Sequence, residues 1–479
     1  MKQNRKRRDR GAQFIRNNLE LLGFGSRRDA LVQAVKELFE NALDATQSLG
    51  SGYSWNDASL QLLRIDVKLN GDTGNVDIVC ADTGSGMHAH QVKLLCCNAF
   101  ETTKTNREGG KRCTSGKYGV GLKAAMLYSQ LQASDACLKI VTTSNSDGIL
   151  YVQLCIDPDL EETAVVKKVA HFVVDENHQQ FSGTEMRLSL PCPQDILELE
   201  SVADTLTLYF QSLRYIAPPF LGVQFNFDVG EISTSVKCLH GEEPIDRFVA
   251  DLGKSADDIL YAVHDEKFAS ISCIALMLGK VELSNESDIE VCLLRFANHA
   301  PLINGDDFFL CGTTKGVCAG KLWKKYGLRC KKTTSHLMNQ LVASPLRAAT
   351  RLKDEGADTS RLVLAVDICV TDSAKDTGIK YGGLKKNTLD ICYADGVQTC
   401  CRAILQQLAE TGRLCTPQQR QDYDLVENFA PLIAKSLAAI VKQSQVCRHS
   451  IVSSQLDRNP QDHLNERLIL QELQAAIRN

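Results

Sequence analysis

A chain of 479 residues is long enough for two or three domains. Its composition, 44% hydrophobic and 23% charged, is that of folded globular proteins, and no apolar run of about 18 residues predicts a transmembrane helix. The net charge of −4 argues against a protein that coats nucleic acid over its whole surface, but it is compatible with local basic patches.

The cysteines and the first residues narrow the class of protein further. Because no N-terminal apolar stretch of the signal-peptide type is present, we expect the 19 cysteines to lie in a reducing compartment as small apolar residues. The absence of any C-x-x-C spacing argues against a structural zinc site. Residues 1–10, MKQNRKRRDR, include six basic residues. They form either a solvated, disordered tail or an arm for nuclear import or phosphate contacts.

The first predicted element is a helix over residues 26–48. Ser26 is expected to cap it, with Asp29 at the capping-box position. Its apolar stripe follows helical spacing and consists of Leu31, Ala34, Val35, Leu38, Ala42 and Ala45. Glu37, Asn41 and Asp44 lie on one line beside this stripe, so we expect them to be half-buried. A buried polar row is costly without a ligand or solvent to satisfy it.

A β-hairpin is predicted next. Its strands alternate apolar and polar residues, with Leu63, Ile65, Val67 and Leu69 on the first and Val76, Ile78 and Cys80 on the second. The second strand leads into ADTGSGM, and a loop rich in Thr, Lys, Arg and Gly follows. In SGKYGVGLKAAMLYSQL, glycines open an apolar helix. Further strands complete a predicted α+β domain that ends near residue 225.

The second half of the chain repeats this mixture. The segments SCIALMLGKVEL, IEVCLLRFANHAPLI and RLVLAVDICV are each predicted to be a strand, and DGVQTCCRAILQQLAETG and DLVENFAPLIAKSLAAIVKQSQ to be helices. A final helix is predicted at NERLILQELQAAI. The helix that begins at DLVENF carries a wide apolar stripe of Leu425, Phe429, Leu432, Ile433, Leu437 and Ile440. We expect part of this stripe to pack on the sheet and part to contact a partner.

The polar residues of the first domain predict a nucleotide site. A carboxylate such as Glu37 can orient a water molecule and take its proton, and the amide oxygen of Asn41 suits magnesium. Asp82 follows a buried strand and needs hydrogen-bond donors, of which the adenine amino group is one. Gly84 and Gly86 would let a flat ring approach the backbone.

The second glycine-rich segment predicts phosphate binding. Gly116, Gly119 and Gly121 precede a helix whose first amides can bind phosphates. The hydroxyl of Thr184, in SGTEM, can support Asp82 from a strand edge. The related string GGKRCTSGKYG is not a P-loop, because its glycines are one residue too far apart and Tyr118 stands where Ser or Thr should bind magnesium.

Taken in order, the segments ELFEN, ADTGSGM, GKYGVGLKAA and GT resemble the boxes of the GHKL (Bergerat-fold) ATPases, which include gyrase, Hsp90, MutL and topoisomerase VI B. FIRNNLELLGF resembles the N-terminal strap of topoisomerase VI B, and RFANHAPLI and LWKKYGL resemble segments of its transducer domain. The resemblance implies an α+β protein, with a GHKL ATPase domain followed by a transducer domain of the ribosomal protein S5 domain 2-like type. The implied bounds are 1–25 for the basic tail and strap, 26–225 for the ATP-binding domain, 226–445 for the transducer and 446–479 for a C-terminal tail with a short helix.

The resemblance also implies roles for individual residues. Glu37 becomes the general base, Asn41 the Mg²⁺ ligand and Asp82 the adenine contact. The implied ATP-binding residues are Asn41, Asp44, Asp82, Gly84, Gly86, Gly116, Lys117, Gly119, Val120, Gly121, Leu122, Lys123 and Thr184. A transducer lysine that reaches the γ-phosphate corresponds to Lys386, or as second choice Lys385, in KYGGLKKNT.

One departure from topoisomerase VI B affects the implied function. In that family a helix-two-turn-helix domain separates the ATPase domain from the transducer, but here only about eighty residues lie between YFQSLRYIAPPF and RFANHAPLI. Such a shortened chain resembles the meiotic topoisomerase VI B-like proteins, which act with a DNA-cleaving, topoisomerase VI A-like transesterase to form double-strand breaks. This implies a nuclear ATPase subunit that works on DNA and dimerises with ATP in a heterotetramer, without a membrane.

Three alternatives remain at this point. The chain could be the B-type subunit of a strand-passing type IIB topoisomerase that lost its extra domain. It could be a non-hydrolysing scaffold with the same fold, although the complete polar row argues against this. It could be a MutL- or Hsp90-type ATPase, against which the segments RFANHAPLI and LWKKYGL argue.

Overall fold

The structure is a computed structural model. It describes residues 13–50, 61–97, 119–143, 148–156, 165–172, 183–216, 220–238, 259–266, 269–278, 287–302, 322, 325–326, 328–332, 360–370, 379–381, 389–414 and 416–449. Of the residues singled out from the sequence, Gly116, Lys117, Lys385 and Lys386 lie outside these ranges. The basic residues 1–10 and the predicted final helix lie outside them as well.

The N-terminal half is built on an eight-stranded sheet with the order β5-β4-β3-β6-β2-β1-β7-β8. The strands are β1 (Gln61–Leu69), β2 (Asn75–Asp82), β3 (Leu138–Thr143), β4 (Ile149–Cys155), β5 (Val165–Phe172), β6 (Gly183–Pro191), β7 (Leu221–Val229) and β8 (Ile232–Cys238). Neighbouring strands pair antiparallel except β1 and β7, which are parallel. Because β8 ends at Cys238, this sheet continues past residue 225, where the sequence placed the domain boundary.

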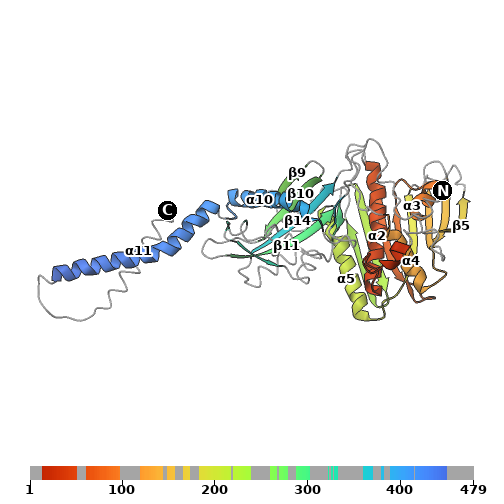
Figure 1. Ribbon diagram of the computed structural model, residues 1–479, viewed down its shortest axis with the longest axis horizontal. Coiled ribbons are helices and arrows are strands. Elements are labelled where there is room, and N and C mark those ends of the chain that lie inside the picture. Colours follow the sequence, from red (N-terminus) through yellow and green to blue (C-terminus); the bar gives the residue numbers. More distant parts are fainter. Residues whose placement is uncertain are drawn as a thin grey trace.

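Three helices cover one face of this sheet, as Figure 1 shows: α2 (Arg27–Gly50), α4 (Gly121–Gln132) and α5 (Ile196–Ser212). α2 contacts β1, β2 and β6, α4 contacts β4 and β6, and α5 contacts β7 and β8. The short helix α3 (Ala89–Cys97) lies beside α4, and the 3-10 turn η2 (Leu213–Tyr215) follows α5. Along β1 and β2 buried and more exposed residues alternate, as expected for a sheet with one covered face.

The local sequence signals of α2 and the first hairpin are confirmed. The backbone N–H of Asp29 donates to Ser26 Oγ over 3.1 Å, which caps the helix. The stripe of α2 is buried from Leu31 to Ala42, and Ala45 is half-buried. The hairpin strands pair in the register that sets Ile65 opposite Cys80. Its alternation ends early, because Leu69 is 43% exposed.

The second half contains a six-stranded sheet with the order β12-β11-β14-β10-β9, and β13 also pairs with β11. The strands are β9 (Ile259–Asp265), β10 (Ala269–Leu278), β11 (Ser287–Ala297), β12 (Ala300–Pro301), β13 (Leu328–Lys332) and β14 (Ser360–Val370). β11 pairs parallel with β14 and with β13, whereas its contact with β12 is antiparallel. The prediction of one strand over IEVCLLRFANHAPLI is therefore wrong, since the chain reverses at Asn298 and His299 to form a hairpin.

Helix α10 (Ala394–Glu410) packs on β9 and β10, preceded by the 3-10 turn η4 (Ile391–Tyr393). It buries Val397, Cys400, Cys401, Ile404, Leu405 and Leu408 in the core of the second sheet. The last described element, α11 (Pro417–His449), extends away from both sheets, as Figure 1 shows. No helix within the described ranges is long and apolar enough to cross a membrane.

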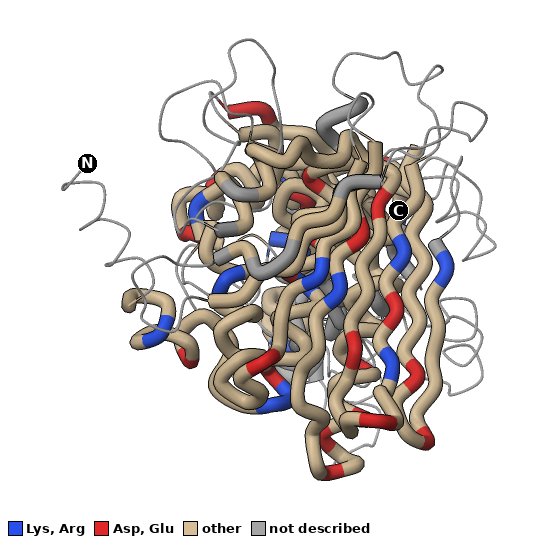
Figure 2. Tube along the Cα trace, turned by 90° about the vertical axis from the view of Figure 1, so that its right-hand side faces the viewer, with Lys and Arg blue, Asp and Glu red and all other residues tan. Residues whose placement is uncertain are grey.

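The charges of the first sheet are mixed. Figure 2 views the side of the molecule that lies farthest from α11, where Lys and Arg are interspersed with Asp and Glu along the described strands. The ion pair Arg64–Glu185 links β1 to β6 across the intervening β2, and Arg187–Glu185 joins two residues of β6. The described part of this side is therefore not a broad basic face, in agreement with the low net charge of the chain.

Candidate nucleotide-binding site

The polar row of α2 lies where this helix meets the start of α4. Glu37 and Asp44 are 7% and 9% exposed, and Asn41 between them is half-buried. Gln33, one turn before Glu37, donates a side-chain N–H to Glu37 Oε1 over 2.9 Å. Gln33 was not among the residues predicted from the sequence, although its spacing of four residues from Glu37 extends the same row.

Gly121, the first residue of α4, provides the space for the Glu37 carboxylate. A Cβ atom on residue 121 would lie 2.0 Å from Glu37 Oε2 and 2.1 Å from its Cδ. The preceding Gly119 has φ +60°, a left-handed conformation that favours glycine. The first amides of a helix attract anions, so α4 begins next to the carboxylate with the polarity that a phosphate also requires. Gly119 and Gly121 therefore allow the candidate base, Glu37, to lie next to the start of α4, which is the candidate phosphate site.

Asp82, at the end of β2, is the second centre of the site. It is 6% exposed, and burial raises the pKa of its carboxyl from 3.8 to about 7, although the backbone amides of Gly84 and Thr184 lower it in part. Gly84 N–H donates to Asp82 Oδ1 over 2.8 Å. Because it is buried, the Asp82 carboxyl would be stabilised by a further hydrogen bond from a ligand.

Residues of β3 and β6 lie beside Asp82. Thr184 lies opposite Asp82 in the β2–β6 register, and its backbone amide, rather than the predicted hydroxyl, is the group that bonds to the Asp82 carboxyl. Its hydroxyl is 2.9 Å from that of Thr142 on β3, which also donates to the carbonyl of Gly183 and accepts from the backbone N–H of Met87. Thr142 was missed, because nothing in LKIVTT distinguishes it from an ordinary strand residue.

Gly84 joins the Asp82 centre to α2. A Cβ atom on Gly84 would lie 3.0 Å from the backbone carbon of Ala45, which follows Asp44 on α2. Gly86 has φ +66°, so glycine is favoured there as well. The loop after β2 therefore passes close to the end of the polar row, and Asp82, Asp44 and Asn41 belong to one site.

The structure gives the other predicted phosphate-binding residues different surroundings. Val120 and Leu122 are buried in the core of the first sheet at 6% and 7% exposure, so only their backbone groups remain for a ligand. Lys123 is 2% exposed, and its ammonium donates to the backbone carbonyl of Leu95 on α3. This places the Lys123 side chain against α3 and makes it a link between α3 and α4.

Tyr381 and Leu389, the described residues on either side of the predicted transducer lysine, pack in the hydrophobic core of the second sheet. These two residues form an isolated antiparallel β-bridge. Burial raises the pKa of Tyr209 on α5 well above its usual value, and the carboxylates of Glu40, Glu37 and Asp44 raise it further.

Tyr209 is a further residue that sequence reasoning missed. It is fully buried, and its hydroxyl has no hydrogen-bond partner among the described residues. The ammonium of Lys36 lies 5.8 Å from the centre of its ring, within the range of a cation–π contact. Because Lys36 precedes Glu37 on α2, this contact helps to fix the rotation of α2 about its axis.

Comparison with known proteins agrees with this geometry. Residues 30–184 match the family described as "Histidine kinase-, DNA gyrase B-, and HSP90-like ATPase", a range that contains Glu37, Asn41, Asp82, Gly121 and Thr184. The chain therefore contains an ATPase domain of the GHKL type, as predicted, and such a domain implies ATP binding. The second sheet lies outside this match, so its transducer type stays a prediction.

Individual relatives point in the same direction. The B subunit of Type 2 DNA topoisomerase 6 from Saccharolobus islandicus (strain Y.N.15.51 / Yellowstone #2) is 34% identical over 182 residues, which are 38% of this chain and 31% of that protein. The corresponding protein of Saccharolobus solfataricus is 33% identical over 182 residues, with the same shares of the two chains. The matched stretch thus spans about a third of the relatives' length. The similarity to topoisomerase VI B is confirmed for this part of the chain.

Proposed function

We propose that this chain binds ATP with Mg²⁺ and acts as the B-type subunit of a topoisomerase VI-like complex, in which an A-type transesterase cleaves DNA. The setting we propose is the formation of meiotic DNA double-strand breaks in the nucleus. The observation that carries the proposal is the fit of the Glu37 carboxylate against Gly121, because it brings a candidate base to the start of a helix that can bind a phosphate.

Each residue of the proposed site has a different role. Bound ATP would supply a phosphoanhydride bond that water can break. The buried Asp82 accepts a hydrogen bond from a donor such as the adenine amino group. Mg²⁺ would be held by the side-chain oxygen of Asn41 together with waters. Glu37 takes the proton of a water molecule, and its orientation is fixed by the N–H of Gln33. The space left by Gly121 keeps the carboxylate close to the phosphate end of the site.

The exposed face of α11 supports an A-type partner. All six residues of its predicted apolar stripe are exposed, at 59% for Leu425, 54% for Phe429, 59% for Leu432, 46% for Ile433, 40% for Leu437 and 61% for Ile440. The expectation that part of this stripe packs on the sheet is therefore wrong for these six residues. The buried side of α11 carries Val426, Ala430 and Ala434 instead. An apolar helix face of this size is typical of a binding surface for another protein.

The short connection between the two sheets favours the formation of DNA double-strand breaks over the passage of one DNA duplex through another. β8 ends at Cys238 and β9 begins at Ile259, which leaves no room for an additional domain at this position. The alternative, the B-type subunit of a strand-passing type IIB topoisomerase, needs the same ATP-dependent pairing of two such chains and the same A-type partner. The two functions differ in the product formed from supercoiled DNA, which makes them separable by experiment.

The first test addresses the nucleotide. We expect calorimetry with the full chain to detect ATP binding that depends on Mg²⁺. Glu37→Ala should keep this binding and lose hydrolysis, since a general base acts on water in the transition state. Glu198→Ala, which changes an exposed glutamate in the first turn of α5, is the control and should change neither. Absence of ATP binding at millimolar concentration would favour the non-hydrolysing scaffold.

The second test addresses the complex. The full chain is incubated with candidate A-type subunits, recovered, and supplied with supercoiled plasmid and ATP. Cleaved DNA without relaxed circles is the expected product. Relaxed, intact circles would support the strand-passing alternative, and a failure to recover any A-type subunit would contradict the proposed partner.

A further inference from the structure

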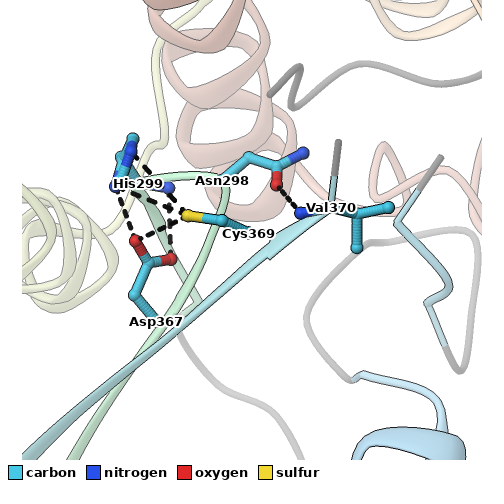
Figure 3. Close-up of polar contacts among 5 residues, drawn as sticks. All are labelled: Asn298, His299, Asp367, Cys369 and Val370. Carbon is cyan, nitrogen blue, oxygen red and sulfur yellow. Dashed lines mark hydrogen bonds and ion pairs between the residues drawn. The ribbon is translucent and has the colours of Figure 1, made fainter. Parts of the chain in front are cut away.

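The turn between β11 and β12 has an unusual backbone. Asn298 and His299 have φ +50° and φ +66°, so both central residues of this tight hairpin are left-handed. Such turns favour Asn or Gly at these positions, and a histidine at the second is uncommon because its Cβ is crowded. The strain persists only when surrounding contacts hold the residue in place. Figure 3 shows these contacts.

Backbone and side-chain bonds fasten this turn to the end of β14. Asn298 N–H donates to the carbonyl of Ile368 over 3.0 Å, and Asn298 Oδ1 accepts from the N–H of Val370 over 2.8 Å. His299 N–H donates to Asp367 Oδ1 over 3.2 Å. These bonds fix the hairpin backbone against β14, and the backbone in turn limits where the His299 ring can lie.

Three groups with metal-binding chemistry meet at this turn. His299 Nδ1 lies 2.5 Å from Asp367 Oδ2, and Cys369 Sγ lies 3.2 Å from the same oxygen. The sulfur is 3.9 Å from His299 Nδ1 and 3.8 Å from Nε2. Asp367 is fully buried, whereas the His299 side chain is 29% exposed and Cys369 is half-buried. The group is therefore fixed on the inside and open to solvent on one side.

The arrangement does not favour Cys369 as a nucleophile. A catalytic thiol needs a neighbouring base that takes its proton, and the base is in turn oriented by a third group. Here the thiol donates to the Asp367 carboxylate over 3.2 Å, and its contacts with the two nitrogens of His299, at 3.9 Å and 3.8 Å, are longer. The carboxylate, which both other groups face, is the centre of the cluster.

We propose that His299 Nδ1, Asp367 Oδ2 and Cys369 Sγ bind a divalent transition metal of the zinc class, with solvent in the fourth position. Imidazole, carboxylate and thiolate are all zinc ligands. Metal binding would release two protons, one from the Cys369 thiol and one from the imidazolium form of His299. The total charge of the cluster is unchanged, because these two protons are replaced by one dication. Ligand atoms around tetrahedral zinc lie about 3.3–3.8 Å apart. Only the His299–Asp367 separation must widen appreciably, and the exposed imidazole has room to move.

The place of the site suggests what a metal would do there. β12 contacts α5, and Ala300, the residue after His299, is 2% exposed in the core cluster of the first sheet. A metal bound by the turn and by β14 would make this junction between the two sheets stiffer. Metal binding here does not depend on nucleotide binding or on an A-type partner, because all three ligands belong to the second sheet and its hairpin.

The test uses the full chain after removal of metals, with zinc ions alone as the probe. We expect the wild-type chain to take up zinc at this site, and both Cys369→Ser and His299→Asn to weaken that uptake more than tenfold. Asn is chosen at position 299 because it tolerates a left-handed backbone and can donate to Asp367. Cys392→Ser is the matched control, since Cys392 also lies beside an aspartate, Asp390, but is not part of a metal-ligand cluster among the described residues.

A residue-specific readout is needed because the chain has 19 cysteines. Alkylation followed by peptide mass spectrometry reports each thiol separately. Zinc should slow the alkylation of Cys369 at least tenfold in the wild type and leave that of Cys392 unchanged, and His299→Asn should remove the protection. If Cys369 reacts at the same rate with and without zinc in the wild-type chain, the metal site is refuted and the three residues serve only to fasten the hairpin.

Discussion

The contact between Gly121 and Glu37 predicts that one methyl group added at residue 121 will strongly reduce ATP hydrolysis, while the chain still folds. In Gly121→Ala the new Cβ would lie 2.0 Å from Glu37 Oε2 and 2.1 Å from Cδ. Carbon and oxygen atoms do not approach closer than about 3.0 Å, so one of the groups must move by about 1 Å or more. Residue 121 is fixed at the start of α4, whereas Glu37 Oε2 is the end of a flexible side chain. The carboxylate will therefore move.

The two consequences differ in size. Moving the carboxylate weakens the bond from Gln33, which is worth about 1.5–3 kcal/mol as a hydrogen bond to a charged group. Replacing glycine by alanine in a helix returns up to about 1 kcal/mol. The net loss of stability is therefore about 0.5–3 kcal/mol. A misplaced general base, in contrast, costs about 100- to 10,000-fold in rate, or about 3–5 kcal/mol of transition-state stabilisation.

The assay combines three measurements on the full chain. Thermal unfolding should shift by only a few degrees, ATP affinity by less than tenfold, and steady-state hydrolysis should fall at least 100-fold. Gly71→Ala is the control, because a Cβ atom there meets no other atom within 4 Å. The double variant Gly121→Ala with Glu37→Ala should hydrolyse no more slowly than Glu37→Ala alone, since both changes remove the same group.

Two results would refute this reasoning. Hydrolysis within threefold of wild type in Gly121→Ala would show that Glu37 is not the base. A further drop in the double variant, beyond that of Glu37→Ala, would show that Gly121 acts through some other group. The variant Gly183→Ala should behave differently from both, because its Cβ would lie 2.0 Å from the backbone oxygen of Asp82 at φ +142°. Neither group can move easily, so we expect that chain to unfold.

The remaining predictions concern Asp82 and α11. Because burial raises the pKa of Asp82 from 3.8 to about 7, the folded chain keeps a proton that the unfolded chain releases, and the free energy of unfolding should fall as pH rises through this window. Asp82→Asn should flatten this pH dependence in thermal unfolding and weaken ATP binding by about 1.5–3 kcal/mol, and an unchanged profile would contradict the buried position. On α11, Phe429→Glu or Leu432→Glu should abolish recovery of the A-type partner without lowering ATP affinity, because both side chains are exposed. The buried Ala430→Glu should instead lower the melting temperature, and loss of ATP binding with any of the three would place α11 in the core.

The sequence by itself determined several elements and brought out the polar residues from which the candidate nucleotide site is built. The helix from residue 26, the first hairpin and the line of Glu37, Asn41 and Asp44 follow from spacings of two, three and four residues. Such spacings depend only on local geometry, which is the same in every helix and strand. Asp82 could be singled out because a carboxylate at the end of an apolar strand is rare without a reason.

The tertiary structure alone decided which distant residues meet. Thr142 reaches Thr184 because β3 and β6 pair in one particular register, and Glu37 meets Gly121 because α2 and α4 pack on the same face. The exposure of the α11 stripe was also beyond the sequence, since periodicity gives the angle between residues and not the direction of the core. His299 and Asp367 are separated by 68 residues and meet only because β11 lies parallel to β14. Spacing rules could not reveal that group, because strand register is set by the packing of the whole sheet.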